Sequence, residues 1–142
     1  MSTANCSFLI TILVLGISLS FSTILALEDY KKGSVTSTVH VINGLPKKSD
    51  SVNVHCNSKY TDLGMYTLNE GEEYKWVAEK QAEYFCEAIW GPRFFASWHA
   101  FQPKRDLVHS GGASVFWLVK KDGFFLSWDN STWVKKSTWE TE

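Results

Sequence analysis

The sequence predicts an all-β fold, a small antiparallel β-sandwich of about eight short strands that follows a cleaved signal peptide. Apolar and polar residues alternate with a period of two along most of the chain, which is typical of half-buried strands. Turn signals recur about every ten residues, as they do between the strands of a sandwich or barrel. No stretch after the leader has the apolar spacing of a convincing amphipathic helix.

The first 26 residues have the features of a secretory signal peptide. Residues 8–27 carry no charge, and residues 8–15 form an apolar h-region. Ala26 is a small residue suited to the position before a cleavage, so we place the cut after it and assign residues 27–142 to one domain. The n-region lacks Lys and Arg, and an uncleaved anchor is the alternative because the apolar stretch is just long enough to span a bilayer. No second such stretch follows, so we expect a secreted protein without stable membrane insertion after cleavage.

Four strands are expected in the N-terminal half of the domain. The inner face of the first is formed by alternate small or β-branched residues, namely Val35, Ser37, Val39 and Val41. Asn43-Gly44-Leu45-Pro46 and the polar run to residue 51 then end it. The inner face of the second is formed by Val52, Val54 and Cys56. Two further turns, at residues 62–64 and 69–72, lead into strands at residues 65–68 and 74–77.

Four more strands are expected in the C-terminal half. One inner face is formed by Tyr84, Cys86, Ala88 and Trp90, and the pattern resumes at residues 94–100 after Gly91-Pro92. Residues 103–112 are interpreted as a longer loop. Residues 114–120 and 124–128 flank Asp122-Gly123, a strong hairpin signal. All seven tryptophans follow residue 75, and strand aromatics are usually core residues, although an aromatic stripe also suits sugar or lipid binding. Trp133 and Trp139 lie in a polar tail, where they would cover a sheet edge or meet a partner.

The charge balance makes nucleic acid an unexpected partner. The formal net charge is −1, with 14 basic and 15 acidic residues. A nucleic-acid binder normally shows a clustered basic footprint.

The cysteines point to one disulfide. Cys6 leaves with the leader, so Cys56 and Cys86 remain as an even pair in an oxidising compartment, where pairing is the default. A disulfide between them would contribute about 3.5–4 kcal/mol in the chain-entropy account. Two buried free thiols are the alternative.

Several segments, in their order and spacing, resemble the plant self-incompatibility S1 family, the S-protein homologues. They are Val54-His55-Cys56-Asn57-Ser58-Lys59, Asp62-Leu63-Gly64, Gly71-Glu72-Glu73-Tyr74-Lys75-Trp76, Tyr84-Phe85-Cys86 and Trp117-Leu118-Val119-Lys120-Lys121-Asp122-Gly123. The resemblance covers about residues 39–128. It implies a small secreted plant β-sandwich that acts as an extracellular ligand. The best-known relatives are pistil proteins recognised by a pollen receptor during self-rejection.

The chain departs from the family in its cysteines. Members usually carry four, the last two just before the tryptophan that corresponds to Trp117. Here that region has none, and Val115 stands where the final one is expected. Loss of one bridge as a unit would leave Cys56 paired with Cys86, whereas crossed connectivity would leave both as free thiols.

The residues offer little support for an enzyme, and we predict no catalytic, cofactor-binding or metal-binding residue. The four histidines lack HExxH or CxxC context. His55 and Cys56 are neighbours on a strand, so their side chains leave opposite faces and do not suit a nucleophile and base pair. Glu70, Glu72 and Glu73 could be the paired carboxylates of a glycoside hydrolase. In a turn, such charges are usually just solvated.

Asn130-Ser131-Thr132 is an N-glycosylation sequon in an exposed-looking position, so Asn130 is the predicted modification site.

The sequence therefore predicts a secreted, non-enzymatic β-sandwich that is recognised by an unknown cell-surface receptor protein and needs no cofactor. We expect specificity in the loops at residues 46–51, 57–61 and 103–112, because loops on a rigid scaffold commonly carry function. One alternative is a defence protein that binds microbial membranes or glycans through exposed tryptophans. A secreted hydrolase is the other.

Overall fold

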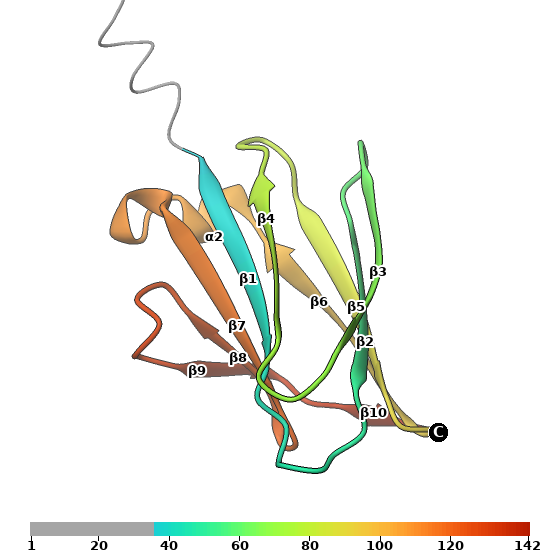
Figure 1. Cartoon of the computed structure of the whole chain (residues 1–142). Coiled ribbons are helices and arrows are strands. Elements are labelled where there is room, and N and C mark those ends of the chain that lie inside the picture. The colour runs from blue at the N-terminus through green and yellow to red at the C-terminus, as the bar shows by residue number, and fades with distance from the viewer. Residues whose placement is uncertain (1–35) are drawn as a thin grey trace, which may run out of the picture. The chain divides into compact units, whose positions relative to one another are not determined.

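The computed structural model describes residues 36–142. The signal peptide expected at residues 1–26, the cut after Ala26 and the strand start expected at Val35 lie outside the described residues. The described part forms ten strands, one helical turn and one 3₁₀ turn (Figure 1). Their bounds are β1 Ser37–Asn43, β2 Val52–Asn57, β3 Asp62–Leu68, β4 Glu73–Ala78, β5 Tyr84–Trp90, β6 Phe94–Phe101, α2 Pro103–Asp106, η1 Ser110–Gly112, β7 Ser114–Lys120, β8 Gly123–Ser127, β9 Val134–Ser137 and β10 Glu140–Thr141.

The strands form two five-stranded sheets that face each other as layers (Figure 1). The orders are β4-β1-β7-β8-β9 and β10-β6-β5-β2-β3. The predicted all-β sandwich is confirmed, and its eight expected strands correspond to β1 to β8. One detail differs: within residues 36–142, β1 and β7 pair in parallel, with Val39 beside Val115, while the other strand pairs are antiparallel. Alternation of residues predicts a strand but carries no information on the direction of a neighbour that is distant in sequence.

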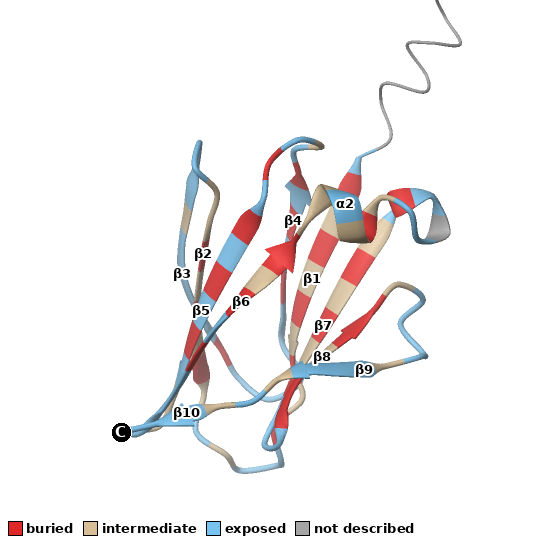
Figure 2. Ribbon diagram, turned by 180° about the vertical axis from the view of Figure 1, so that it is seen from behind, coloured by how far each residue is buried: buried red, intermediate tan, exposed pale blue. Residues whose placement is uncertain are grey.

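The core lies between the two sheets and is built from the alternate residues of each strand. Figure 2 shows this alternation as bands of buried residues, separated by half-buried ones along β1 and β7 and by exposed ones along β5. Trp117, Phe101 and Phe124 are among the largest fully buried side chains, and each such side chain contributes about 1.5–3 kcal/mol through burial. The indole Nε1 of Trp117 also donates to the carbonyl of Ala100 at 2.8 Å, which ties β7 in one sheet to β6 in the other.

The C-terminal tail, described above as polar, adds an edge strand to each sheet. β9 pairs with β8, and β10 pairs with Phe94 and Phe95 of β6. Between them, Trp139 packs on Phe124 with ring centroids 4.7 Å apart and on Trp90 at 5.6 Å, and its Nε1 donates to the carbonyl of Lys120 at 2.8 Å. Two roles were considered for this tryptophan, covering a sheet edge or contacting a partner. The structure shows a covering role, because Trp139 packs over the end of the sandwich.

Glycine is required where β8 begins beside β9. Gly123 has a φ of 140°, and a Cβ built there would lie 2.2 Å from the carbonyl oxygen of Ser137. Any side chain at this position would therefore push β9 away and strain the backbone.

Candidate functional site

The strand registers gather three connections at one end of the sandwich. Tyr84 of β5 lies opposite Phe101 of β6, and Asn57 of β2 lies opposite Phe85. This places residues 58–61, 79–83 and 102–113 at the same end. The loop at residues 46–51 follows β1 and lies at the other end, where Val52 pairs with Trp90. Two of the three loops expected to carry specificity are thus brought together, and the third is not.

The connection between β2 and β3 is held rigidly by one serine. The Ser58 hydroxyl accepts hydrogen bonds from the backbone N–H groups of Tyr60 and Thr61 at 3.2 and 3.1 Å, and the Ser58 N–H donates to the Thr61 carbonyl at 2.8 Å. These bonds form a tight local turn of the kind that serine favours. Because the backbone is fixed, the side chains at the tip are presented in a defined arrangement.

The tip carries an exposed aromatic side chain and a cation. Tyr60 is 64% exposed, and the Lys59 ammonium lies 4.9 Å from the centre of its ring. Beside them is a pocket of about 440 Å³, which lies in the size range of small-ligand and side-chain pockets. The pocket is lined by residues of two connections and the start of β5, namely Asn57, Ser58, Lys59, Tyr60, Gln81, Ala82, Glu83 and Phe85.

The connection at residues 79–83 was not among the loops expected to carry specificity. It is short, and in the sequence its polar residues indicate only that one alternating strand ends and the next begins. A signal for its role would have required knowing that β5 pairs with β2, which places the start of β5 and the preceding connection beside residues 58–61.

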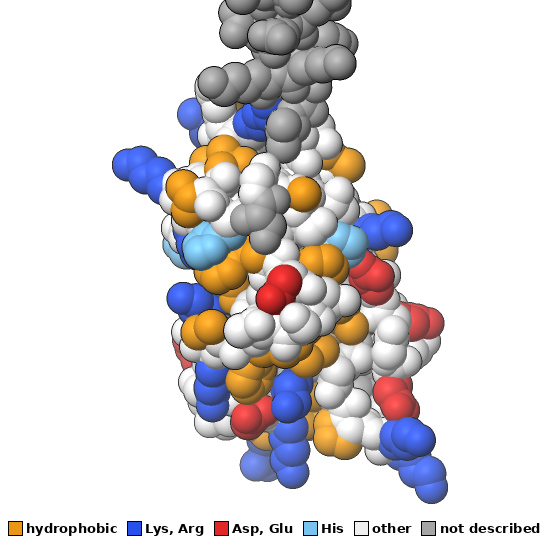
Figure 3. Space-filling view, turned by 90° about the vertical axis from the view of Figure 1, so that its left-hand side faces the viewer, with side chains coloured by type: hydrophobic (Ala, Val, Ile, Leu, Met, Phe, Trp, Pro, Cys, Tyr) orange, Lys and Arg blue, Asp and Glu red, His pale blue; other side chains and the backbone are white. Residues whose placement is uncertain are grey.

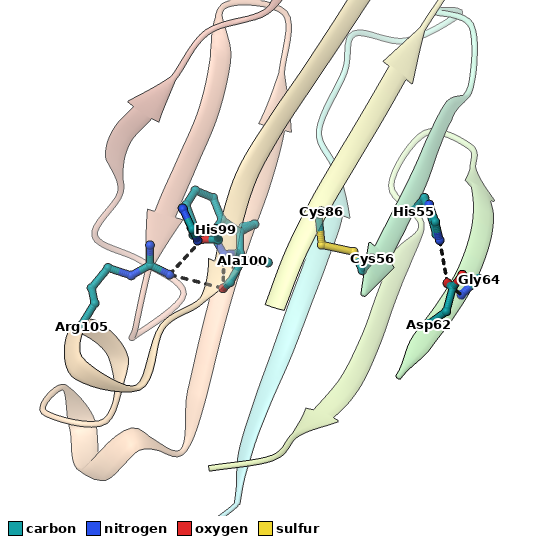
Figure 4. The surroundings of a disulfide bond; sticks show 9 residues. His55, Cys56, Asp62, Gly64, Cys86, His99, Ala100 and Arg105 are labelled. Atoms are coloured by element: carbon teal, nitrogen blue, oxygen red, sulfur yellow. Dashed lines mark hydrogen bonds and ion pairs between the residues drawn. A yellow bond between two sulfur atoms is a disulfide. The ribbon is translucent and has the colours of Figure 1, made fainter. Parts of the chain in front are cut away.

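The base of the same hairpin is fixed by His55 and Asp62. The Nε2 atom of His55 lies 2.6 Å from a carboxylate oxygen of Asp62, and that oxygen also accepts the Gly64 N–H at 2.8 Å (Figure 4). The Gly64 hydrogen bond, followed by the contact with His55, lowers the pKa of Asp62. Asp62 therefore stays ionised to lower pH and keeps the β2–β3 hairpin closed.

Cys56 and Cys86 form a disulfide bond (Figure 4). The two residues are direct partners on the antiparallel strands β2 and β5, with Cα atoms 4.1 Å apart. Both are fully buried, whereas His55 faces outward from the same strand. The bridge therefore staples the sheet that carries the residue 58–61 tip, and its sulfurs are not placed to act with His55 as a nucleophile and base.

Two of the three carboxylates considered for glycoside hydrolysis, Glu72 and Glu73, make separate local contacts. Glu72 accepts the backbone N–H of Asn69 at 2.9 Å and so closes the turn before β4. Glu73 contacts Nδ1 of His40 on the outer face of the neighbouring strand.

Across residues 36–142, no group of three or more His, Cys, Asp or Glu side chains could hold a metal ion. In the same range, no helix has the length and apolar character needed to cross a membrane.

The long connection between β6 and β7 is anchored by a buried carboxylate. Asp106 is fully buried and accepts from the Gln102 N–H, from the Arg105 guanidinium and from the indole of Trp128. Trp128 in turn stacks on His109, with ring centroids 3.6 Å apart. Sequence reasoning missed this role, because Asp106 stands in a polar stretch that resembles a solvated loop.

The predicted glycosylation site lies in the exposed connection between β8 and β9. Asn130 has a φ of 59°, in the left-handed region that asparagine tolerates. The turn is held by the preceding Asp129, whose carboxylate accepts the N–H groups of Ser131 at 2.9 Å and Thr132 at 2.7 Å. Asn130 therefore projects from an ordered turn that is accessible to a modifying enzyme.

Comparison with known proteins gives one consistent result. Residues 38–139 match the protein family described as plant self-incompatibility protein S1. S-protein homolog 21 of Arabidopsis thaliana is 31% identical over 110 residues, which cover 72% of this chain and 82% of that protein. A solved structure of self-incompatibility protein homologue (SPH) proteins, described as a widespread family of small, highly stable, secreted proteins from plants, superposes with a TM-score of 0.60 at 20% identity. That superposition covers 74% of this chain and 95% of the solved one.

Proposed function

The chain belongs to the plant self-incompatibility protein S1 family, whose members are secreted plant proteins, and from this premise we propose that it acts as an extracellular signalling ligand without enzymatic activity. Its proposed partner is a cell-surface receptor protein. The observation that carries the proposal is the rigid tip at residues 58–61, which presents Lys59 and Tyr60 beside the pocket of about 440 Å³.

The tip has the physical properties of a recognition element. Tyrosine supplies a large contact area with few rotatable bonds, and it is enriched among the residues that dominate binding energy. The hydrogen bonds of Ser58 hold the backbone before binding, so little conformational entropy is lost when a partner docks. The pocket gives a partner side chain a place to insert next to the exposed ring.

The absence of an enzymatic role is supported by how the reactive side chains are used. Cys56 is bonded to Cys86, His55 holds the Asp62 carboxylate, and Glu72 closes a turn. Each of these groups has a structural partner and lies outside the pocket beside the tip. A hydrolase would need a nucleophile or water-activating base with charge-stabilising donors around one point.

The alternative of a defence protein that acts through exposed tryptophans is not favoured. All seven tryptophans lie in the described residues, and none of them is among the exposed large hydrophobic side chains. The exposed large hydrophobic side chains are Tyr, Met, Val, Phe and Ile residues, so none of the described tryptophans is largely exposed to a membrane or a glycan.

The test uses the full chain secreted from plant cells and incubated with plasma membranes of the plant that makes it. We expect saturable binding that is removed by protease treatment of the membranes. The affinity of the variant Lys59→Ala/Tyr60→Ala should be lower by about tenfold or more, as expected when a central recognition residue is removed. Lys121→Ala, in the exposed turn at the opposite end, is the matched control and should bind normally.

Two results would oppose the proposal. Binding that is unchanged in the Lys59→Ala/Tyr60→Ala variant would remove the tip from recognition. Equal binding to protein-free liposomes or to microbial polysaccharide would favour the defence alternative over a receptor.

A further inference from the structure

A second pocket lies at the open side of the sandwich, between β6 of one sheet and β9 of the other. It has a volume of about 380 Å³ and is lined by Ser97, Trp98, His99, Gln102, Arg105, Trp117, Lys136 and Ser137. β10 pairs only with the first two residues of β6, so the β6 edge at the pocket has no strand beside it in the described part of the chain. The volume is roughly ten times the 30 Å³ that one water molecule occupies in the liquid.

The walls of this pocket concentrate unmet hydrogen-bonding capacity. Among residues 36–142, four buried side-chain nitrogen or oxygen atoms lack a hydrogen-bond partner. Three of the four belong to residues that line this pocket: Trp98 Nε1, His99 Nδ1 and Ser137 Oγ. The Trp98 side chain is the most buried of these, since that residue is only 5% exposed. A buried donor without a partner destabilises the fold, so such groups normally bind an ordered water molecule or a ligand.

The available groups are mainly hydrogen-bond donors and cations. Arg105 has five N–H groups, and its Nη1 uses one of its two hydrogens on Gln102 at 3.3 Å, which leaves the other directed to no acceptor among the described residues. Lys136 is exposed and makes no ion pair within residues 36–142. No Asp or Glu lines the pocket. Arg105 is ion-paired with the buried Asp106 through Nε and Nη2, so Lys136 is the lining cation without an ion pair in residues 36–142. A free ammonium among neutral hydrogen-bond donors matches a ligand that carries acceptors and a negative charge.

A strand irregularity directs Lys136 toward this site. Lys135 pairs with Phe125 and Ser137 pairs with Phe124, so Lys136 is an extra residue in β9 with no partner in β8. A bulge of this kind re-aims a side chain, and bulges are frequent beside functional sites. Lys136 lines the pocket, whereas its neighbour Lys135 does not. Figure 3 looks onto the β9 side and shows Lys and Arg side chains along much of its left-hand part, with Asp and Glu mainly to the right.

We propose that this pocket binds a carboxylate-bearing sugar, with the Lys136 ammonium pairing with the carboxylate and the remaining Nη1 hydrogen of Arg105 donating to it. Trp98, Ser137 and the amide of Gln102 bind the hydroxyl groups. A hexuronate unit combines these two kinds of group in one small ring, which the pocket is large enough to take.

The test is calorimetric titration of the full chain, secreted from plant cells, with trigalacturonate. We expect saturable binding with one site per chain. Lys136→Gln should weaken it about tenfold, as expected for the loss of one charge-assisted contact. Lys135→Gln removes the same charge from the next residue and should leave the affinity unchanged. Ser137→Ala, which removes one unpaired hydroxyl, should weaken binding less than Lys136→Gln does.

Two comparison ligands separate the sources of the carboxylate. A neutral galactose trisaccharide should not bind measurably, and citrate should bind more weakly than trigalacturonate. Tighter binding of citrate would overturn the sugar assignment in favour of a free organic acid. Undetectable binding of all three would mean that water alone fills the pocket, and equal weakening by Lys135→Gln would mean non-specific attraction; either result overturns the proposal.

Discussion

Replacement of Asp106 by alanine is predicted to destabilise the domain strongly, although this residue lies in a connection and outside the sheets. Its carboxylate is fully buried and accepts from the Gln102 N–H at 2.8 Å, from Arg105 Nε at 2.7 Å and Nη2 at 2.9 Å, and from Trp128 Nε1 at 3.0 Å. The alanine variant would leave the Gln102 N–H, Arg105 Nε and Trp128 Nε1 without their acceptor and the Arg105 charge without its carboxylate. Arg105 Nη2 would keep the carbonyls of His99 and Ala100, at 3.1 and 3.4 Å. The connection between β6 and β7 would also lose its link to Trp128.

The size of the effect follows from the burial of the pair. Removal of one partner from a buried ion pair costs about 3–5 kcal/mol, because the remaining charge is left without compensation. That is a large share of the 5–15 kcal/mol that typically separates folded from unfolded states. At roughly 4–8 °C per kcal/mol for a domain of about 100 residues, the melting temperature should fall by at least about 10 °C.

Circular dichroism melts and urea titrations of the purified chain measure this change. Asp122→Ala, in the exposed turn between β7 and β8, is the matched control and should stay within about 0.5 kcal/mol of the parent. Asp106→Asn keeps the shape and one acceptor, so it should fall between the parent and Asp106→Ala. An Asp106→Ala variant as stable as Asp122→Ala would refute the reasoning, because the network would then contribute nothing.

Four other predictions test separate parts of the structure. Reduction of the Cys56–Cys86 bridge, which closes a loop with a sequence separation of 30, should lower the free energy of unfolding by about 3.5–4 kcal/mol in urea titrations; an unchanged midpoint would contradict this. Hydrogen bonds from the backbone of Thr132 and Ser131 and from Ser127 lower the pKa of Asp129, so its stabilising effect is present above the unfolded pKa of about 3.9 and is lost as pH falls below it. The acid-induced decline should be smaller in Asp129→Ala, and identical pH profiles would refute the assignment. Burial, and then the charge of Tyr66, raises the pKa of Tyr74 to about 12, so stability should fall as pH rises above about 10. An ultraviolet titration should show a late tyrosine that Tyr74→Phe removes, and uniform titration near pH 10 would contradict it. The secreted chain should lose mass on treatment with an N-glycosidase and Asn130→Gln should not, whereas an unchanged parent mass would show that the sequon is unused.

The strands of the fold were predictable because their signal is local. Val39 and Val41 alternate with Thr38 and His40, and burial of one face requires that pattern. The parallel pairing of β1 with β7 was not predictable in this way, because it depends on where distant segments meet. β9 and β10 were missed since they are short edge strands, and Lys135-Lys136 within β9 reads as a solvated tail.

The candidate site was likewise predictable only where its signal is local in the sequence. Residues 57–61 were predictable as a loop because Asn57, Ser58 and Lys59 interrupt an apolar pattern. Their position beside Gln81 and Glu83 was not predictable, since it depends on the pairing of β2 with β5. The burial of Asp106 was equally hidden, because its partner Trp128 lies 22 residues away and is brought close only by the fold.

The most direct test of the proposed ligand role is a binding isotherm of the labelled, full-length secreted chain on plasma membranes of the plant that makes it. We predict saturable binding that the unlabelled chain displaces. Unlabelled Lys121→Ala should displace it at the same concentration as the parent chain, whereas Lys59→Ala/Tyr60→Ala should require a concentration about tenfold higher or more. Binding that does not saturate, or that Lys59→Ala/Tyr60→Ala displaces as well as the parent, would contradict recognition through the residue 58–61 tip.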